Sequence, residues 1–358
     1  MQTKLVYVLT CAPEATYIEQ ALISIWSARY HNPDAYIVLL VDDLTNQLLV
    51  GKRAELLEYI TEKVVIPFED ANATMMYRSR WIKTSVRQLV KGDFLFIDCD
   101  TIITCDLSHV EAVEAEIAMV RDENINIEDE DSASAQPMIN NCKAVGFDVT
   151  KEKYYFNSGV MYVKDTPLTH QLYNRWHELW QDGVNKGINL DQPTFAKANV
   201  DIGHPVVLLE DKWNTIVQSQ IEDVYSAYIL HFWHSVSFLF DKHVMKHLRE
   251  NGLSDVIKYY ILHPTETFLP SDNHIYYYKC KDYLRFYKVL KCTLMTYAKY
   301  IDSSFSEVEK RLPYAQYIKR LLQYKCYNLA SMLVVSAKIY RVRCSSKYVH
   351  YTNFYAKK

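Results

Sequence analysis

The chain has 358 residues, of which 49% are apolar and 23% charged, so it can build a substantial core in about two domains. This composition excludes disorder over most of the length, and only 8 glycines and 10 prolines exclude a collagen-like chain. The formal net charge of −3 hides a division, because residues 241–358 carry 21 Lys and Arg against 9 Asp and Glu. The preceding 240 residues hold 19 basic and 34 acidic groups, and so acidic a surface excludes nucleic acid as their partner.

The cysteines and apolar runs indicate a cytoplasmic protein. Eight cysteines without a C-x-x-C pair predict free thiols rather than a disulfide framework, a zinc ribbon or a redox motif. The apolar run at residues 5–9 is too short for a signal-peptide core, and no run approaches the ~18 residues of a membrane span. We expect a cytoplasmic location, with peripheral contact at the inner membrane face through the basic segment.

Strand and helix patterns alternate along the first hundred residues. Apolar runs predict buried strands at residues 5–9, 36–41, 64–67 and 94–98, and amphipathic patterns predict helices over 18–26, 48–60 and 75–89. This order predicts an α/β fold with a mainly parallel sheet and helices on both faces. Ligands of such sheets bind beyond the carboxyl ends of the strands, so Thr10, Asp42 and Asp98 should lie near one crevice.

The remaining patterns divide the chain into two regions. Further strands are predicted at residues 117–120, 159–163, 206–209 and 228–233, with helices starting at Thr166-Pro167 and at Asp191. Six of the ten residues from Asp122 to Asp131 are acidic, which predicts a solvated loop or a lid. Beyond Asp241 the pattern is helical and holds 17 of the 29 tyrosines. We therefore expect a catalytic domain over 1–240 and a basic, mainly helical region over 241–358.

Asp98-Cys99-Asp100 ends a buried strand and is the sharpest chemical motif. Side chains alternate along a strand, so both carboxylates should face one side and Cys99 the other. Two such carboxylates repel each other unless a cation lies between them, and oxygen ligands suit Mn²⁺ or Mg²⁺. The plainer interpretation is that both are turn residues. His231 ends another apolar segment and would complete an oxygen and nitrogen ligand set.

Several short motifs, in this order, resemble those of glycosyltransferase family 8 and its glycogenin-like relatives. They are Asp98-x-Asp100 after Phe-Leu-Phe-Ile, the stretch Tyr155-Phe156-Asn157-Ser158-Gly159-Val160-Met161, the pair Asp191-Gln192, and the late His231. The resemblance covers about residues 3–240. It implies a GT-A fold and retaining transfer of a hexose from a nucleotide sugar, usually UDP-linked, to a glycan or lipid-linked acceptor, using Mn²⁺.

The resemblance also assigns roles to individual residues. It implies that Asp98, Asp100 and His231 hold the metal, and that Gln192 lies near the anomeric carbon beside Asp191. The donor would be contacted by Arg80, assisted by Lys83, and by Asp122, Asn157 and Ser158, with Thr10 and Asp42 lining the nucleoside pocket. Each has a plainer alternative, such as a surface cation for Arg80, a turn residue for Asn157 or a helix cap for Asp191.

The sequence departs from the family where a lysine usually grips the diphosphate shortly after the final histidine. Here His231 is followed by Phe-Trp-His-Ser, so His234 or Lys242 would have to replace that lysine. The basic tail predicts either an anionic-membrane contact or a helical bundle packed on the first domain. A haloacid-dehalogenase-type phosphatase and a non-catalytic carbohydrate-binding scaffold are the alternative functions.

Overall fold

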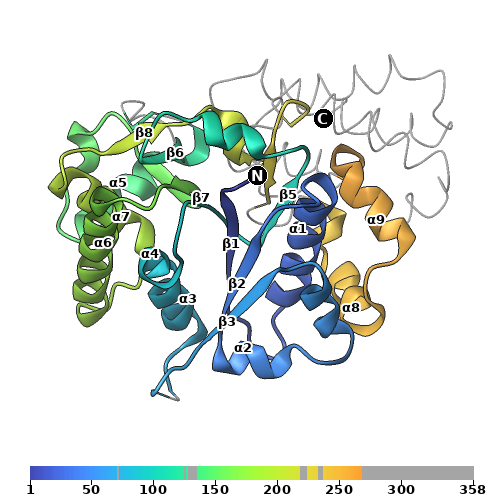
Figure 1. Cartoon of the computed structure of the whole chain (residues 1–358). Coiled ribbons are helices and arrows are strands. Elements are labelled where there is room, and N and C mark those ends of the chain that lie inside the picture. The colour runs from blue at the N-terminus through green and yellow to red at the C-terminus, as the bar shows by residue number, and fades with distance from the viewer. Residues whose placement is uncertain (71, 125, 128–134, 218–223, 233–236, 268–358) are drawn as a thin grey trace, which may run out of the picture. The chain divides into compact units, whose positions relative to one another are not determined.

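The computed structural model describes residues 1–70, 72–124, 126–127, 135–217, 224–232 and 237–267 (Figure 1). They fall in one compact unit, Met1–Thr267. The predicted helical character of residues 241–358 is borne out as far as Thr267 by two helices, Lys242–Asn251 and Asp255–Leu262, whereas residues 268–358 and His234 lie outside the described residues.

A seven-stranded mixed sheet forms the centre of this unit, in the order β3-β2-β1-β4-β7-β6-β8. Its strands are β1 (Lys4–Leu9), β2 (Ile37–Asp42), β3 (Glu62–Ile66), β4 (Phe94–Ile97), β6 (Ile117–Arg121), β7 (Phe156–Val163) and β8 (Val206–Leu208). Strand β7 pairs antiparallel with both β4 and β6, whereas the other pairings are parallel. A second sheet has the order β5-β10-β9, with β5 (Thr101–Ile103), β9 (Thr215–Ile216) and β10 (Ile229–His231).

Helices cover both faces of the large sheet, so the predicted α/β class with a mainly parallel sheet is confirmed for the described residues (Figure 1). The helices are α1 (Tyr17–His31), α2 (Asp43–Leu48), α3 (Met75–Thr84), α4 (Val86–Leu89), α5 (Ala135–Ala144), α6 (Pro167–Asn185), α7 (Asp191–Asp201), α8 (Lys242–Asn251) and α9 (Asp255–Leu262). One core cluster joins Val6, Leu40 and Phe96 of the sheet to Ile82 of α3 and Trp176 of α6. Burial of this apolar surface fixes α3 and α6 over the sheet.

Two predicted helices are divided. The pattern over residues 48–60 belongs to the end of α2 and to a 3-10 helix, Gly51–Glu58, which starts at Gly51 with a positive φ of 57°. The pattern over 75–89 is split at Ser85 into α3 and α4. Periodicity alone does not report such breaks, because both pieces keep an apolar face toward the core.

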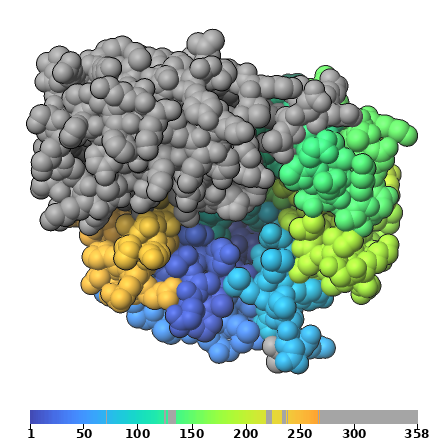
Figure 2. All heavy atoms as spheres, turned by 180° about the vertical axis from the view of Figure 1, so that it is seen from behind, coloured from blue at the N-terminus to red at the C-terminus, as the bar shows by residue number. Residues whose placement is uncertain are grey.

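Helices α8 and α9 belong to the first unit, which runs to Thr267, whereas we expected a boundary near residue 240. Glu19 of α1, with only 1% of its side chain exposed, lies 2.6 Å from Arg53 Nε and 3.1 Å from Arg249 Nε of α8. Figure 2 shows α8 and α9 in orange directly against the blue N-terminal residues. Within the described residues, no helix is both long and apolar enough to cross a membrane.

Candidate functional site

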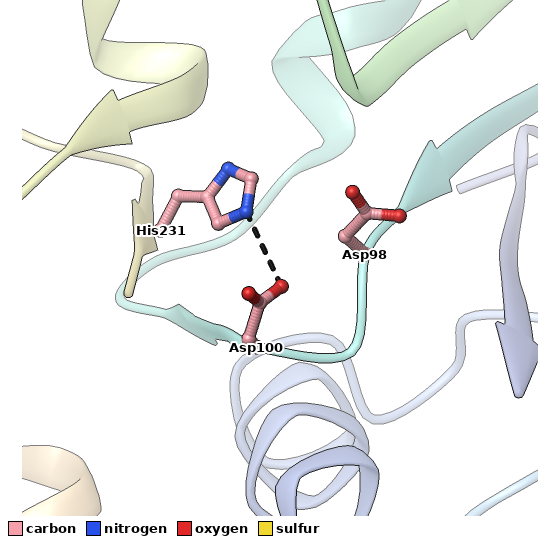
Figure 3. Close-up of side chains that lie close together, drawn as sticks. All are labelled: Asp98, Asp100 and His231. Atoms are coloured by element: carbon pink, nitrogen blue, oxygen red, sulfur yellow. Dashed lines mark ion pairs between the residues drawn. The ribbon is translucent and has the colours of Figure 1, made fainter. Parts of the chain in front are cut away.

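Asp98, Asp100 and His231 come together at the carboxyl end of β4. Each offers a ligating atom, and these atoms all lie within 4.8 Å of one another (Figure 3). His231 Nε2 lies 3.2 Å from Asp100 Oδ1. The antiparallel pairing of β10 with β5, in which His231 is opposite Thr101, carries the histidine to the aspartates. The expected convergence of these three residues is therefore present in the structure.

The two carboxylates converge for a different reason from the predicted strand alternation. Strand β4 ends at Ile97, and Asp98 to Asp100 form the turn into β5. Cys99 nevertheless faces away from the site, because its thiol is buried and donates to the Val8 carbonyl at 3.3 Å. The turn leaves about 30% of each aspartate side chain exposed, so both carboxylates remain open to a ligand.

Gly159 lies directly beneath this cluster, on β7. A Cβ at this position would be 2.5 Å from His231 Cε1, 2.8 Å from Asn157 Oδ1 and 3.0 Å from Asp98 Oδ2. Distances below about 3 Å are closer than carbon atoms pack, so the site requires a residue without a side chain here. The family motif contained this glycine, but its steric role is visible only in the structure.

Two cations from α3, the buried Lys83 and the partly exposed Arg80, meet the carboxylates. Lys83 Nζ lies 3.1 Å from Asp98 Oδ1 and 3.6 Å from Asp191 Oδ2, and Arg80 Nε lies 2.7 Å from Asp191 Oδ1. The helical spacing of Arg80 and Lys83 places both on the same face of α3. Arg80 is therefore paired inside the site rather than a surface cation.

Asp191 is the first residue of α7, but it does not cap that helix. The cap position is Leu190, and the Asp191 carboxylate accepts instead from Ser158 Oγ at 3.1 Å. Burial raises the pKa of Asp191, but Arg80 and Lys83 outweigh it and hold the pKa below the usual range. Asp191 is thus a buried, ionised carboxylate with two cations beside it.

Asp122, Asn157 and Gln192 form the adjoining polar cluster. Asn157 Nδ2 donates to Asp122 Oδ1 at 2.7 Å, and Gln192 Nε2 donates to Asp122 Oδ2 at 2.6 Å. Asn157 belongs to β7 rather than to a turn. Burial raises the pKa of Asp122 despite these two hydrogen bonds. The cluster therefore presents amides and a carboxylate, which can exchange hydrogen bonds with sugar hydroxyls.

Asp100 and His231 influence each other's titration in opposite directions. Burial raises the pKa of Asp100, but the adjacent imidazole outweighs it and holds the pKa below the usual range. Burial lowers the pKa of His231, but Asp100 reverses this and raises the pKa above its ordinary value. An ion pair between the two is the form that this environment stabilises.

Thr10 and Asp42 lie at the ends of β1 and β2, and both are buried and engaged internally. Asp42 Oδ1 accepts from the Thr45 backbone amide at 3.0 Å, and Arg78 Nη1 lies 3.1 Å from Asp42 Oδ2. Thr10 Oγ1 donates to the Met75 carbonyl at 3.4 Å. Asp42 thus caps α2 and pairs with a buried arginine, which sequence reasoning did not consider.

Asn214 is a further site residue that sequence reasoning missed. It is fully buried at the end of a 3-10 helix, Asp211–Asn214, and lies between Asn157 and His231. Its signal was the same as that of Asn157, a small polar residue directly before an apolar strand, but without a matching family motif it was not singled out.

No family model matches the chain, and no curated protein matches it. Solved structures that are similar to it include glycosyltransferases. They include mouse xyloside xylosyltransferase 1 in its apo form (16% identity, TM-score 0.42, covering 65% of this chain and 98% of that one). Galactosyltransferase LgtC in complex with donor and acceptor sugar analogs has 11% identity and a TM-score of 0.46, covering 72% of this chain and 99% of that one. Glycosyltransferase GlyE of Streptococcus pneumoniae TIGR4 has 16% identity and a TM-score of 0.42, covering 75% and 66%.

Proposed function

We propose that this chain is a metal-dependent glycosyltransferase that moves a hexose from a nucleotide sugar, UDP-linked, to a glycan or lipid-linked acceptor. The observation that carries the proposal is the convergence of Asp98, Asp100 and His231 within 4.8 Å, beside two cations and a polar cluster. Retention of configuration follows from the family resemblance.

The donor set fits a divalent cation. Within the part of the chain that the structure describes, four carboxylates, those of Asp98, Asp100, Asp122 and Asp191, meet two fixed cations, so two negative charges remain when His231 is neutral. Two carboxylates and one imidazole suit Mn²⁺, with Mg²⁺ as the harder alternative. When bound, the ion would be held by Asp98, Asp100 and His231 and would act as a Lewis acid toward the diphosphate.

Arg80 and Lys83 supply the fixed positive charge that a leaving diphosphate needs. Both are held by Asp191, so their positions are set before a ligand arrives and little reorganisation is required. Lys83 is buried and contacts Asp98, which favours it as the residue that replaces the missing lysine after the last histidine. Lys242, by contrast, is exposed at the start of α8.

Gln192, Asp122 and Asn157 would bind the sugar. A site that hydrogen-bonds hydroxyl groups rejects sugars that lack them, since its own polar groups would then stay unpaired. Gln192 is anchored by Asp122 and also accepts from the Ser158 amide at 3.4 Å, so its side-chain amide is held in place near the expected anomeric carbon.

The alternative functions fit the site less well. A haloacid-dehalogenase-type phosphatase carries its D-x-D motif near the start of its fold, whereas β1, β2 and β3 all precede the strand that leads to Asp98. A non-catalytic scaffold would not need the paired cations beside Asp191. The proposed setting is cytoplasmic, with peripheral membrane contact through residues 241–358 and no nucleic-acid partner.

Thermal unfolding of the full chain with nucleotide sugars tests this proposal. We expect one UDP-sugar to raise the melting temperature only when Mn²⁺ or Mg²⁺ is present, since a ligand that binds the folded state stabilises it. Product analysis with that sugar should then show transfer or slow hydrolysis. Hydrolysis of a simple phosphate monoester without any response to nucleotide sugars would favour the phosphatase instead.

A further inference from the structure

We propose that Thr101 and Ser24 are positioning residues that hold the turn from Asp98 to Asp100 in its metal-binding shape. Thr101 is the first residue of β5, Ser24 lies in the middle of α1, and both are fully buried. The functional meaning rests on the proposed metal role, whereas the effect of the pair on the turn can be measured without metal.

Three hydrogen bonds hold the backbone of this turn, which leaves β4 at Asp98 and continues past Asp100 (Figure 3). The Asp98 amide donates to the Gly159 carbonyl of β7 at 2.8 Å, and the Phe232 amide donates to the Asp100 carbonyl at 2.8 Å. Both bonds join main-chain groups, so they do not depend on the side chains involved. The third runs from Thr101 Oγ1 to the Asp98 carbonyl at 2.9 Å. Of the three, this is the bond that requires a particular residue type.

Ser24 connects the Thr101 hydroxyl to α1. Ser24 Oγ lies 2.7 Å from Thr101 Oγ1, between a helix and a strand that pack directly on each other. A buried hydroxyl without a partner is costly, so each of the two groups stabilises the position of the other. The orientation of Thr101 that reaches the Asp98 carbonyl is therefore also the one that reaches α1.

Thr101 is also next to the other two candidate ligands. It directly follows Asp100 in the chain, and in the pairing of β5 with β10 it is opposite His231. A shift of Thr101 would therefore disturb all three ligating groups, which now lie within 4.8 Å of one another. Ligands that are already in place bind a metal with little reorganisation, and loss of the groups that orient them lowers its affinity.

Ser27, one turn further along α1, provides a matched comparison. It is fully buried as well, and its hydroxyl donates to the Ser24 carbonyl at 2.7 Å and accepts from the Ile103 amide of β5 at 2.9 Å. Ser27 thus joins the same helix to the same strand, but through Ile103 and not through the residue that bonds Asp98. A purely structural role predicts similar effects of losing either serine hydroxyl, whereas a positioning role predicts that only Ser24 and Thr101 affect the turn.

Amide hydrogen exchange of the metal-free full chain gives the first readout. The Asp98 amide is bonded to the Gly159 carbonyl, so its exchange reports opening of the turn. Thr101→Val keeps the branched shape of the side chain but lacks the hydroxyl. We expect it to speed exchange of the Asp98 amide by about tenfold relative to Ser27→Ala, the factor that one hydrogen bond contributes to such an opening. Thr101→Ser, which keeps the hydroxyl, should exchange much as the unaltered chain does.

Mn²⁺ titration by calorimetry gives the second readout. We expect Thr101→Val to weaken Mn²⁺ binding by about 10–100-fold, the usual effect of losing a group that orients a metal ligand. Ser27→Ala and Thr101→Ser should bind as the unaltered chain does. Ser24→Ala should also weaken binding, and adding it to Thr101→Val should cause no further loss, because Ser24 acts through Thr101.

Two results would overturn the inference. One is a Thr101→Val chain that matches Ser27→Ala in both Asp98 exchange and Mn²⁺ affinity, with Ser24→Ala providing the same comparison if Thr101→Val does not fold. The other is a loss of Mn²⁺ affinity in the double variant equal to the sum of the single losses, which would separate Ser24 from Thr101. Absence of Mn²⁺ binding by the unaltered chain would contradict the proposed function instead, and exchange of the Asp98 amide would still decide whether the pair positions the turn.

Discussion

Lys83 binds Asp98 through both carboxylate oxygens, at 3.1 and 3.2 Å, and also lies 3.6 Å from Asp191. A buried ammonium therefore balances charge at the same carboxylate that we assign to the metal. The two cations compete electrostatically, so binding of the metal should depend on the charge of Lys83.

Replacing Lys83 with methionine tests this competition. Lys83→Met leaves Asp98 and Asp191 short of a positive charge, which should destabilise the metal-free protein by about 1–3 kcal/mol, since Asp98 is about 30% exposed and water screens part of the loss. Mn²⁺ should then raise the melting temperature of the variant more than that of the unaltered chain. Lys197→Met, which removes an exposed pair with Asp201, is the control. Equal Mn²⁺ responses in all three proteins would refute the competition.

Asp100→Ala should remove one metal ligand without unfolding the protein, because about 30% of the Asp100 side chain is exposed. We expect Mn²⁺-dependent stabilisation to disappear and transfer from a nucleotide sugar to fall by about 10²–10³-fold. The measurements are unfolding with and without Mn²⁺ and product formation. Asp106→Ala, in the turn that follows β5, is the control and should retain both properties. Full transfer by Asp100→Ala would exclude the ligand role.

Gly159→Ala should disturb the ligand cluster from below. The added methyl group would lie 2.5 Å from His231 Cε1, so the ring must move, and we expect weaker Mn²⁺ binding and a stability loss of about 1–3 kcal/mol. Val160→Ala, a cavity-forming change at the next residue of β7, separates the two effects because it should lower stability only. Unchanged Mn²⁺ affinity in Gly159→Ala would show that the close approach is not important for the site.

His177 of α6 should contribute to acid sensitivity. It lies 2.7 Å from Thr84 Oγ1, and burial lowers its pKa below the ordinary value of 6.5. The unfolded chain therefore binds a proton first, so stability should be full above about pH 6.5 and fall as the pH drops toward the folded-state pKa. Urea unfolding across this range should show a shallower fall for His177→Gln, while His243→Gln on the exposed side of α8 should match the unaltered chain.

Glu19 should be important for the packing of α8 on α1. Its buried carboxylate lies 2.6 Å from Arg53 and 3.1 Å from Arg249, so Glu19→Gln leaves two arginines without their common counter-charge. We expect a loss of about 3–5 kcal/mol in the free energy of unfolding, measured in urea. Glu250→Gln, in an exposed pair with Lys246, should change it by less than about 1 kcal/mol. Similar losses in both variants would contradict a structural role for the buried network.

The family motifs and the polar clusters at element boundaries supplied most of the candidate site, namely Asp98, Asp100, Asn157, Asp191 and His231. They do not predict which residues each carboxylate contacts. An aspartate in the first turn of a helix can either cap that helix or pair with a cation from elsewhere in the fold. For Asp191 only the position of α3, which brings Arg80 to it, decides between the two roles. Asp42 was expected to line a nucleoside pocket. In the structure one of its carboxylate oxygens accepts a hydrogen bond at the start of α2, and the other pairs with Arg78.

The sequence by itself determined the alternation of strands and helices, the position of the two aspartates after a buried strand, and the chemical class of the ligands. Those properties are local, since they depend on apolar periodicity and on residue type within a few positions. Only the tertiary structure decided that His231 reaches Asp100 from another sheet, that Gly159 makes room for its ring, and that Asn214 hydrogen-bonds to it. Contacts of this kind join residues far apart in the chain, and strand pairing and core packing, which no single segment encodes, bring them together.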